Sequence, residues 1–307
     1  MERLFTFIGV TTGQSAIMQI FPAWAQYLGL TGVSIVGCDL PIGAPPEQYR
    51  AVVQRMKENP NDMGALVTTH KIDLYTACRD LFDWVDRYAE LCGEVSCLSK
   101  RGNSFQGHAK DPISSGKTLE KILGPGYWGR TGGHVLCLGA GGSGLAIALH
   151  LITRQEKADR PVRIIAVDQN PNRLDSMRAV LSPLESDTEM QYVLNADAAT
   201  NDALMGELPP GSLVINATGM GKDTPGSPIT DRARFPEGGI AWELNYRGAL
   251  DFLHQANRQR LERNLSVHDG WDYFIHGWTS VMEQVFDMEI GGTQLADMSE
   301  IARAMRI

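Results

Sequence analysis

The chain has 307 residues, a formal net charge of −8 at pH 7, 43% apolar residues and 21% charged residues. Its length is about twice the ~150 residues of an average domain, which indicates two domains, and its apolar content excludes a disordered chain. The negative charge argues against a general binder of nucleic acids or anionic membranes, because such partners select basic surfaces. We therefore expect neither nucleic acid nor membrane as a partner.

The cysteines and the N-terminal segment indicate a cytoplasmic protein. The N-terminal segment lacks the basic start, long apolar region and cleavage site of a secretory signal, and no stretch approaches the ~20 apolar residues that cross a bilayer. The five cysteines form no CxxC pair, and Cys38 and Cys137 lie in apolar runs typical of strands. We expect reduced, buried thiols.

The first third of the chain alternates short apolar runs (4–10, 33–40 and 64–69) with helical patterns (15–28 and 46–59). This alternation predicts βαβ units and a mainly parallel sheet. One or two helices should follow Lys71 and extend to about Leu91. Residues 101–103 then separate two short runs as a hairpin turn does, so we expect the sheet to end in antiparallel strands.

A glycine-rich segment, 123–133, shows no periodicity and is predicted to be a linker. Beyond it, strands and helices alternate again as far as residue 268, which predicts a second, larger parallel sheet. The last two patterns, 271–286 and 293–305, are amphipathic helices that we expect to pack on the first domain. The predicted fold class is therefore α/β with two domains.

Residues 134–151 read as a strand, a glycine turn and a helix. Gly139, Gly141 and Gly144 have the GxGxxG spacing of dinucleotide-binding turns: the first permits the tight turn, the second lets backbone approach a pyrophosphate, and the third lets the helix pack on the strand. The backbone of the whole turn and the helix N-terminus would bind the phosphates. The remaining residues of this predicted cofactor site are Ala140, Gly142 and Ser143.

Asp168 ends the next apolar run and lies 24 residues after Gly144, close to the ~20 residues expected for the acid that binds the ribose hydroxyls. Alternatively, Asp168 only ends a strand or caps the helix that begins near Pro171. An acid disfavours a 2′-phosphate, so we predict NAD, with NADP as the less favoured cofactor. A second glycine-rich cluster would let the cofactor pass close to the next strand end, through Asn216, Thr218, Gly219 and Gly221.

Taken together, these segments resemble the shikimate and quinate dehydrogenase family over nearly the whole chain. Six motifs occur in the family's order: Gly9 to Ser15, Val67 to Lys71, a segment ending at Asp111, the GAGGSG turn, Asn216 with its glycines, and Asp269 followed by a helix. The resemblance implies a substrate-binding domain over 1–112, joined by the C-terminal helices 271–307, and a Rossmann-type, doubly wound NAD(P)-binding domain over 113–270.

The resemblance also implies a catalytic pair, Lys71 and Asp111. Removal of hydride from a carbinol carbon requires loss of the hydroxyl proton, which a lysine beside a carboxylate can accept and return. By themselves, Lys71 could be a solvated surface lysine and Asp111 the N-cap of a helix starting near Pro112. The motif context favours the catalytic interpretation.

The substrate contacts depart from the family's pattern. Ser15 is kept, but Ile17 replaces the second serine of the usual pair, and the segment from Val67 to Lys71 is one residue shorter and lacks its proline. Ser96 replaces an asparagine, and His276 lies beside the position of a glutamine. The predicted substrate residues are Ser15, Thr68, Ser96, Tyr246 and His276, with Lys110 as a further candidate.

Several changed contacts to one ligand indicate a changed substrate, because unpaired polar groups in a buried site are costly. We predict an NAD-dependent oxidoreductase acting on a secondary alcohol of a small polyhydroxylated acid: shikimate, quinate, a related sugar acid or a cyclic polyol. The alternative is a non-catalytic dinucleotide-binding sensor or regulatory protein on the same fold. No metal is expected, and the protein should be a monomer or a homodimer.

Overall fold

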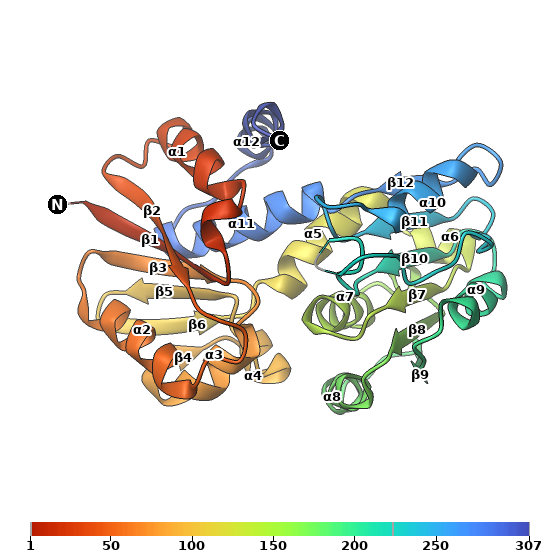
Figure 1. The fold of residues 1–307 in the computed structure, drawn as a ribbon, viewed down its shortest axis with the longest axis horizontal. Helices are drawn as coiled ribbons and strands as arrows, with labels where there is room; N and C mark the ends of the chain where they lie inside the picture. Colours follow the sequence, from red (N-terminus) through yellow and green to blue (C-terminus); the bar gives the residue numbers. More distant parts are fainter. Residues whose placement is uncertain (1, 223, 307) are drawn as a thin grey trace. The chain divides into compact units, whose positions relative to one another are not determined.

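The computed structural model describes residues 2–222 and 224–306, and the chain divides into two compact units. The first unit comprises Met1–Lys110 and Gly277–Ile307, and the second comprises Asp111–His276. Each unit carries a six-stranded, mainly parallel sheet with helices (Figure 1). The predicted α/β fold with two domains is therefore confirmed.

The first unit contains the N-terminal sheet and its helices. They are β1 (Arg3–Gly9), η1 (Thr12–Gln14), α1 (Ile17–Tyr27), β2 (Val33–Asp39), α2 (Pro46–Glu58), β3 (Asp62–Val67), α3 (Lys71–Cys78), η2 (Arg79–Leu81), β4 (Trp84–Val85), α4 (Arg87–Cys92), β5 (Cys97–Arg101) and β6 (Ser104–His108), followed by the end of α11 (Trp271–Phe286) and α12 (Gly292–Ala304). The strand order is β2-β1-β3-β5-β6-β4. β1 pairs in parallel with β2 and β3, and β5 and β6 form the predicted antiparallel hairpin.

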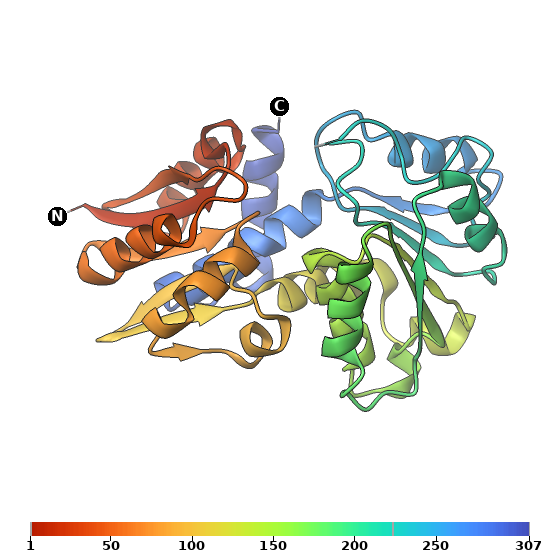
Figure 2. The same ribbon diagram turned by 60° about the horizontal axis from the view of Figure 1, so that its bottom comes forward.

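Strand β1 shows why this sheet has helices on both faces. Its alternate residues Phe5 and Phe7 contact Trp278 of α11 edge-on, with ring centroids 5.9 and 5.0 Å apart. Ile8 points to the opposite face and joins the core that α2 and α3 cover. With α1 and α12 on one face and α2 and α3 on the other (Figure 1 and Figure 2), the strand is buried on both sides, which explains its nearly continuous apolar sequence.

The second unit contains the remaining elements. They are α5 (Asp111–Leu123), α6 (Tyr127–Thr131), β7 (Val135–Leu138), α7 (Gly142–Ile152), η3 (Lys157–Asp159), β8 (Arg163–Asp168), α8 (Pro171–Leu181), β9 (Glu189–Leu194), α9 (Ala198–Gly206), β10 (Leu213–Asn216), β11 (Ile240–Glu243), α10 (Asp251–Gln259), β12 (Ser266–His268) and the start of α11. The order β12-β11-β10-β7-β8-β9 is all parallel. Counted within the unit and read from β9, it is 3-2-1-4-5-6, the order of dinucleotide-binding sheets.

Three expectations need correction. The segment 123–133 is not a linker: it lies inside the second unit and contains α6, while the unit boundary falls between Lys110 and Asp111. Residues 84–85, expected within a helical region, form the short strand β4, which pairs in parallel with β6 at the edge of the sheet. Cys38 and Cys92 are only half-buried, although all five cysteines are free thiols.

Candidate functional site

The three glycines of the turn after β7 have three different surroundings. Gly139 has φ +110°, and a Cβ there would come within 2.5 Å of the carbonyl oxygen of Ala217. A Cβ on Gly144 would lie 2.2 Å from the Gly139 carbonyl oxygen, whereas a Cβ on Gly141 would meet nothing within 4 Å. The first glycine thus permits the turn, the third permits close packing, and the second borders open space.

The N-terminus of α7 carries no side chain that caps it. Its N-cap residue, Gly141, offers only backbone, so the first N–H groups of the helix have no acceptor on a capping side chain. Uncapped N–H groups and the positive end of the helix dipole together attract an anion. The turn fits a pyrophosphate.

Asp168 lies beside this turn, at the carboxyl end of the neighbouring strand β8. Its side chain is 4% exposed, Oδ2 accepts a hydrogen bond from Ala140 N at 2.8 Å, and Oδ1 accepts one from Asn170 N at 2.9 Å. The helix that follows is capped by Asn170, whose side chain accepts from Asn172 N. Asp168 therefore does not cap α8: its carboxylate holds the glycine turn against β8.

The predicted cluster after β10 is also brought to this edge. Asn216 is buried, and its Oδ1 accepts hydrogen bonds from the N–H and the hydroxyl of Thr218 at 3.1 and 2.6 Å. Gly219 and Gly221 have φ values of +79° and +86°, which favour glycine. The Asn216 side chain thus shapes the loop from inside, while Gly219 and Gly221 permit the backbone conformation of the loop.

Glu243, at the end of β11, is a site feature that the sequence analysis missed. It is fully buried, and Oε2 accepts from Asn216 Nδ2 at 2.6 Å while Oε1 accepts from the N–H and side chain of Asn245 at 2.8 and 2.7 Å. Burial raises the pKa of Glu243 to about 7, against these hydrogen bonds, and the charge of Asp269 raises it further. The available signal was an acid that ends an apolar strand, as Asp168 does.

In the first unit, Lys71 begins α3 directly after the turn that leaves β3. Its backbone N–H donates to the carbonyl of Thr68 at 3.2 Å, and its carbonyl accepts from Val95 N at 3.2 Å. The hydroxyl oxygen of Ser96 accepts from Lys110 N at 2.7 Å. The structure therefore brings Thr68, Lys71 and Ser96 together, with the Ser96 oxygen already engaged by backbone.

The turn that carries Lys71 is fixed by the buried side chain of His70. Its Nε2 lies 3.0 Å from the carbonyl oxygen of Leu40, and its Nδ1 lies 3.0 Å from the hydroxyl of Tyr49. A carbonyl can only accept, so Nε2 carries the proton and Nδ1 accepts from Tyr49. His70 thus ties the turn both to the segment after β2 and to α2.

The other predicted substrate residues of this unit have unequal access. Ser15 is half-buried and follows the short helix η1, but Ile17, at the position of the family's second serine, is fully buried in α1. The segment that follows β1 is fixed by Asp39, whose Oδ1 accepts hydrogen bonds from the N–H and the hydroxyl of Thr12 at 2.8 and 2.6 Å. Ile17 therefore serves the core.

Two further charged side chains lie near Ser96. Glu94 is only 3% exposed, in the segment whose next residue donates to the Lys71 carbonyl. Its signal in the sequence is an acid two residues before Ser96, in Gly93-Glu94-Val95-Ser96. The ammonium of Lys110 donates to Gln284 Oε1 at 2.7 Å, so this candidate contact is bonded within the first unit.

The remaining predicted residues belong to the second unit. Asp111 is the first residue of α5 and is 8% exposed, and its carbonyl accepts from the Ser115 hydroxyl at 2.7 Å. The ring of Tyr246 packs against the rings of Trp271 and Phe274, with centroids 5.4 and 4.6 Å apart. His276 is 7% exposed and is the last residue of this unit.

Two further features of the described residues concern metal ions and membrane spans. Among residues 2–222 and 224–306, no group of three or more His, Cys, Asp or Glu side chains is placed to hold a metal ion. Within the same residues, no helix has the length and apolar character that a membrane span requires.

The fold and the glycine turn define the class: a two-domain α/β protein whose second unit has the Rossmann strand order. No family profile matches the chain. One curated relative, the shikimate dehydrogenase (NADP(+)) of Lactococcus lactis subsp. cremoris, is 25% identical over 172 residues, which are 56% of this chain and 57% of the relative. The match thus spans little more than half the length of that relative.

Solved structures extend the similarity in fold to almost the whole chain. The shikimate 5-dehydrogenase of Thermus thermophilus, with NADP(H) and shikimate, has a TM-score of 0.73 at 21% identity and covers 99% of this chain and 100% of its own. The quinate dehydrogenase of Corynebacterium glutamicum, with NAD, has a TM-score of 0.73 at 18% identity, and the match covers 99% of each chain. The 5-ketofructose reductase of Gluconobacter sp. has a TM-score of 0.72 at 16% identity, and the match covers 100% of this chain and 99% of its own.

The chain is therefore similar to shikimate and quinate dehydrogenases, and the predicted resemblance is confirmed. At these identities the solved structures establish the fold and leave the substrate and the cofactor open. Three reductases or dehydrogenases with different substrates share this fold, so the substrate must be argued from the site itself.

Proposed function

We propose that the protein is an NAD-dependent dehydrogenase that acts on a secondary alcohol of a small polyhydroxylated acid. The observation that carries the proposal is the glycine turn at Gly139–Gly144, which has an uncapped helix N-terminus and a buried acid, Asp168, at the adjacent strand end. A nicotinamide dinucleotide, when bound, supplies the hydride chemistry. The turn and the loop after Asn216 would hold it.

The preference for NAD rests on Asp168. Each carboxylate oxygen accepts one backbone N–H and, having two lone pairs, can also accept from a ribose hydroxyl. Arg173, with Nη1 3.7 Å from Oδ2 and a side chain 56% exposed, is the group that would favour a 2′-phosphate. Asp168→Ala should therefore weaken NAD relative to NADP, and Arg173→Ala should weaken NADP alone. Equal effects of both variants on the two cofactors would contradict the assigned preference.

In the proposed reaction, Lys71 accepts the proton of the substrate hydroxyl during oxidation and returns it during reduction. Asp111 is the second residue of the proposed catalytic pair. The turn that carries Lys71 is fixed by His70, which leaves little freedom in the position of the Lys71 backbone. A preorganised base loses less entropy when the substrate binds.

A substrate other than shikimate is supported by the first unit. Ile17 lies in the core, the Ser96 oxygen accepts a backbone N–H, and the acid Glu94, two residues before Ser96, is buried. These changes support a sugar acid or a polyol as the substrate, with Ser15 and Thr68 holding its polar groups.

The test is reduction of NAD or NADP, followed at the nicotinamide absorbance band, with shikimate, quinate and a panel of sugar acids and polyols. Lys71→Ala should lower kcat about 10²–10⁴-fold, the usual contribution of a general base. Lys157→Ala is the matched control, because that side chain is 81% exposed and lies in η3 of the other unit. If no substrate reduces either cofactor while NAD still binds, the protein binds the dinucleotide without catalysis.

A further inference from the structure

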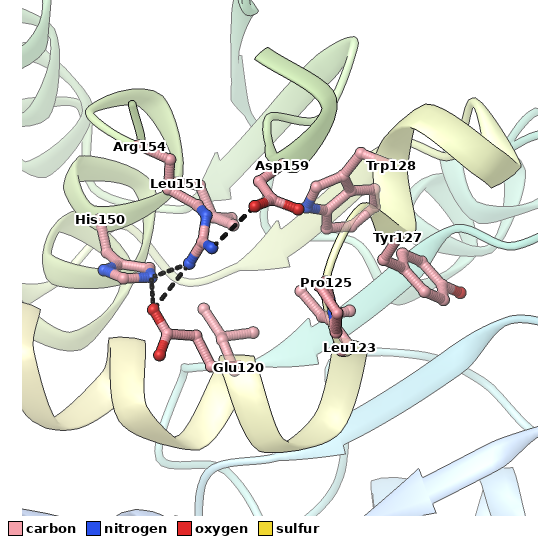
Figure 3. Close-up of a pocket in the computed structure, with 11 residues that line it drawn as sticks. Glu120, Leu123, Pro125, Tyr127, Trp128, His150, Leu151, Arg154 and Asp159 are labelled. Atoms are coloured by element: carbon pink, nitrogen blue, oxygen red, sulfur yellow. Dashed lines mark hydrogen bonds and ion pairs between the residues drawn. The ribbon is translucent and has the colours of Figure 1, made fainter. Parts of the chain in front are cut away.

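A pocket with a cavity volume of about 190 Å³ lies in the second unit, bounded by α5, α6, the end of α7 and η3 (Figure 3). Its apolar side is formed by three buried side chains and three at the rim. The buried ones are Leu119, Trp128 and Leu151, and those at the rim are Leu123, Pro125 and Tyr127. An enclosed apolar cavity of about 150 Å³ holds one benzene molecule, so the volume of this pocket suffices for one aromatic ring.

The polar side of the pocket is organised by Arg154. Its Nη1 donates to Glu120 Oε1 at 2.8 Å and its Nη2 to Asp159 Oδ2 at 3.0 Å, from opposite sides of the guanidinium (Figure 3). Asp159 is 16% exposed and also accepts the N–H of Gly126, whereas Glu120 is 56% exposed. Asp159 is thus part of the framework, while Glu120 is a surface carboxylate whose pairing adds little stability.

His150 adds no charge to this cluster. Its Nε2 lies 3.3 Å from Arg154 Nη1, and because a guanidinium only donates, Nε2 accepts. Burial and the charge of Arg154 lower the pKa of His150, which keeps the ring neutral near pH 7. The cation at the polar side of the pocket is therefore Arg154.

We propose that this pocket binds a small carboxylic acid with a flat or branched apolar body. The ligand carboxylate takes the place of Glu120 on Nη1 of Arg154, and Glu120 turns into solvent. One carboxylate replaces another, so the charge on the guanidinium stays balanced. The apolar body fills the space against Leu119, Leu151 and Trp128, which is surface that Glu120 cannot cover.

The pocket is separate from the proposed cofactor site. The glycine turn precedes the first turn of α7, whereas His150 and Leu151 lie in its last turn. Eleven helical residues span about 16 Å at 1.5 Å per residue. Binding here does not depend on the proposed dehydrogenase activity, and its test needs no turnover.

The experiment is titration of the full chain with 4-fluorobenzoate, observed by ¹⁹F NMR, with 4-fluorobenzamide and 4-fluorobenzylamine as neutral and cationic probes of the same shape. The acid should bind at least tenfold more tightly than either. Glu120→Gln, at an exposed position, should tighten the acid severalfold by removing the competing carboxylate. Arg154→Gln should weaken it at least tenfold, while Arg163→Gln, a partly exposed arginine in β8, should have no effect.

Three results would overturn the proposal: equal binding of the acid and the amide, preference for the amine, or an affinity that Glu120→Gln leaves unchanged. The Glu120 variant also keeps the test decisive if Arg154→Gln fails to fold. Removing an exposed carboxylate does not threaten the core, and only competition at Arg154 predicts tighter binding of an acid.

Discussion

Glu243 should make the second unit less stable as the pH rises from 5 to 8. Its carboxyl is fully buried, and burial raises its pKa from 4.5 to about 7. In the unfolded chain the group ionises near its ordinary pKa, so the folded state holds the proton more tightly between the two values. The contribution of Glu243 to stability is therefore fully present below pH 4.5 and is lost as the pH rises through 7. At ~1.4 kcal/mol per pH unit, the loss is about 3 kcal/mol.

The perturbation that isolates this effect is Glu243→Gln, which keeps the shape and removes the titration. Urea unfolding at pH 5, 6, 7 and 8, followed by tryptophan fluorescence, gives the free energy of unfolding at each pH; the buried Trp242 is adjacent in β11. The amide places one N–H₂ among the donors of Asn216 and Asn245, so the variant should lose stability at pH 5. As the pH rises, the free energy of unfolding of the variant should then increase by about 3 kcal/mol relative to that of the wild type.

The matched control is Glu262→Gln, because Glu262 is 68% exposed and pairs at the surface with Arg234. Its stability profile should run parallel to that of the wild type. If the Glu243→Gln profile is also parallel to the wild type between pH 5 and 8, the Glu243 carboxyl titrates in its ordinary range. The assigned cost of its ionisation would then be wrong.

Three further substitutions test single contacts. Gly139→Ala forces a Cβ to within 2.5 Å of a backbone carbonyl, so it should destabilise the second unit and abolish NADH binding. Gly141→Ala should fold normally and lose only NADH binding. Thermal melting measures the stability of each variant, and NADH fluorescence measures its binding. Tyr49→Phe leaves the buried Nδ1 of His70 without its donor and should cost about 1–3 kcal/mol in urea unfolding; an unchanged midpoint would exclude the hydrogen bond. Trp24→Phe removes a 2.8 Å hydrogen bond to a carbonyl of α12 and should speed amide exchange in that helix, and equal rates would show that packing alone docks it.

The sequence predicted the elements whose signals are local. The alternation of apolar runs and helices predicted two mainly parallel sheets, and residues 101–103 predicted the hairpin between β5 and β6. The prediction that 123–133 is a linker was wrong because its glycines do not join the two units: Gly126 and Gly132 flank α6 and have positive φ values. Composition alone cannot separate a linker from a helix bounded by glycines.

Within the site, the glycine turn could be predicted from the spacing of its glycines: Gly139 and Gly144 meet steric requirements, whereas Gly141 borders open space. Asp168 was located, but its hydrogen bond to Ala140 depends on two strands that are adjacent only in the folded sheet. Glu94 and Glu243 were missed because the sequence shows an acid without showing that it is buried. Burial is decided by segments far apart in the chain.

What the sequence by itself determined is the class of fold and the place of the glycine turn after β7, because both follow from backbone conformation and from the period of apolar residues. Only the tertiary structure decided which polar atoms are already engaged. It buries Ile17 in the core, gives the Ser96 hydroxyl oxygen a hydrogen bond from a backbone N–H, and raises the pKa of Glu243. Hydrogen bonding and desolvation depend on distance in space, so they become defined only when the chain has folded.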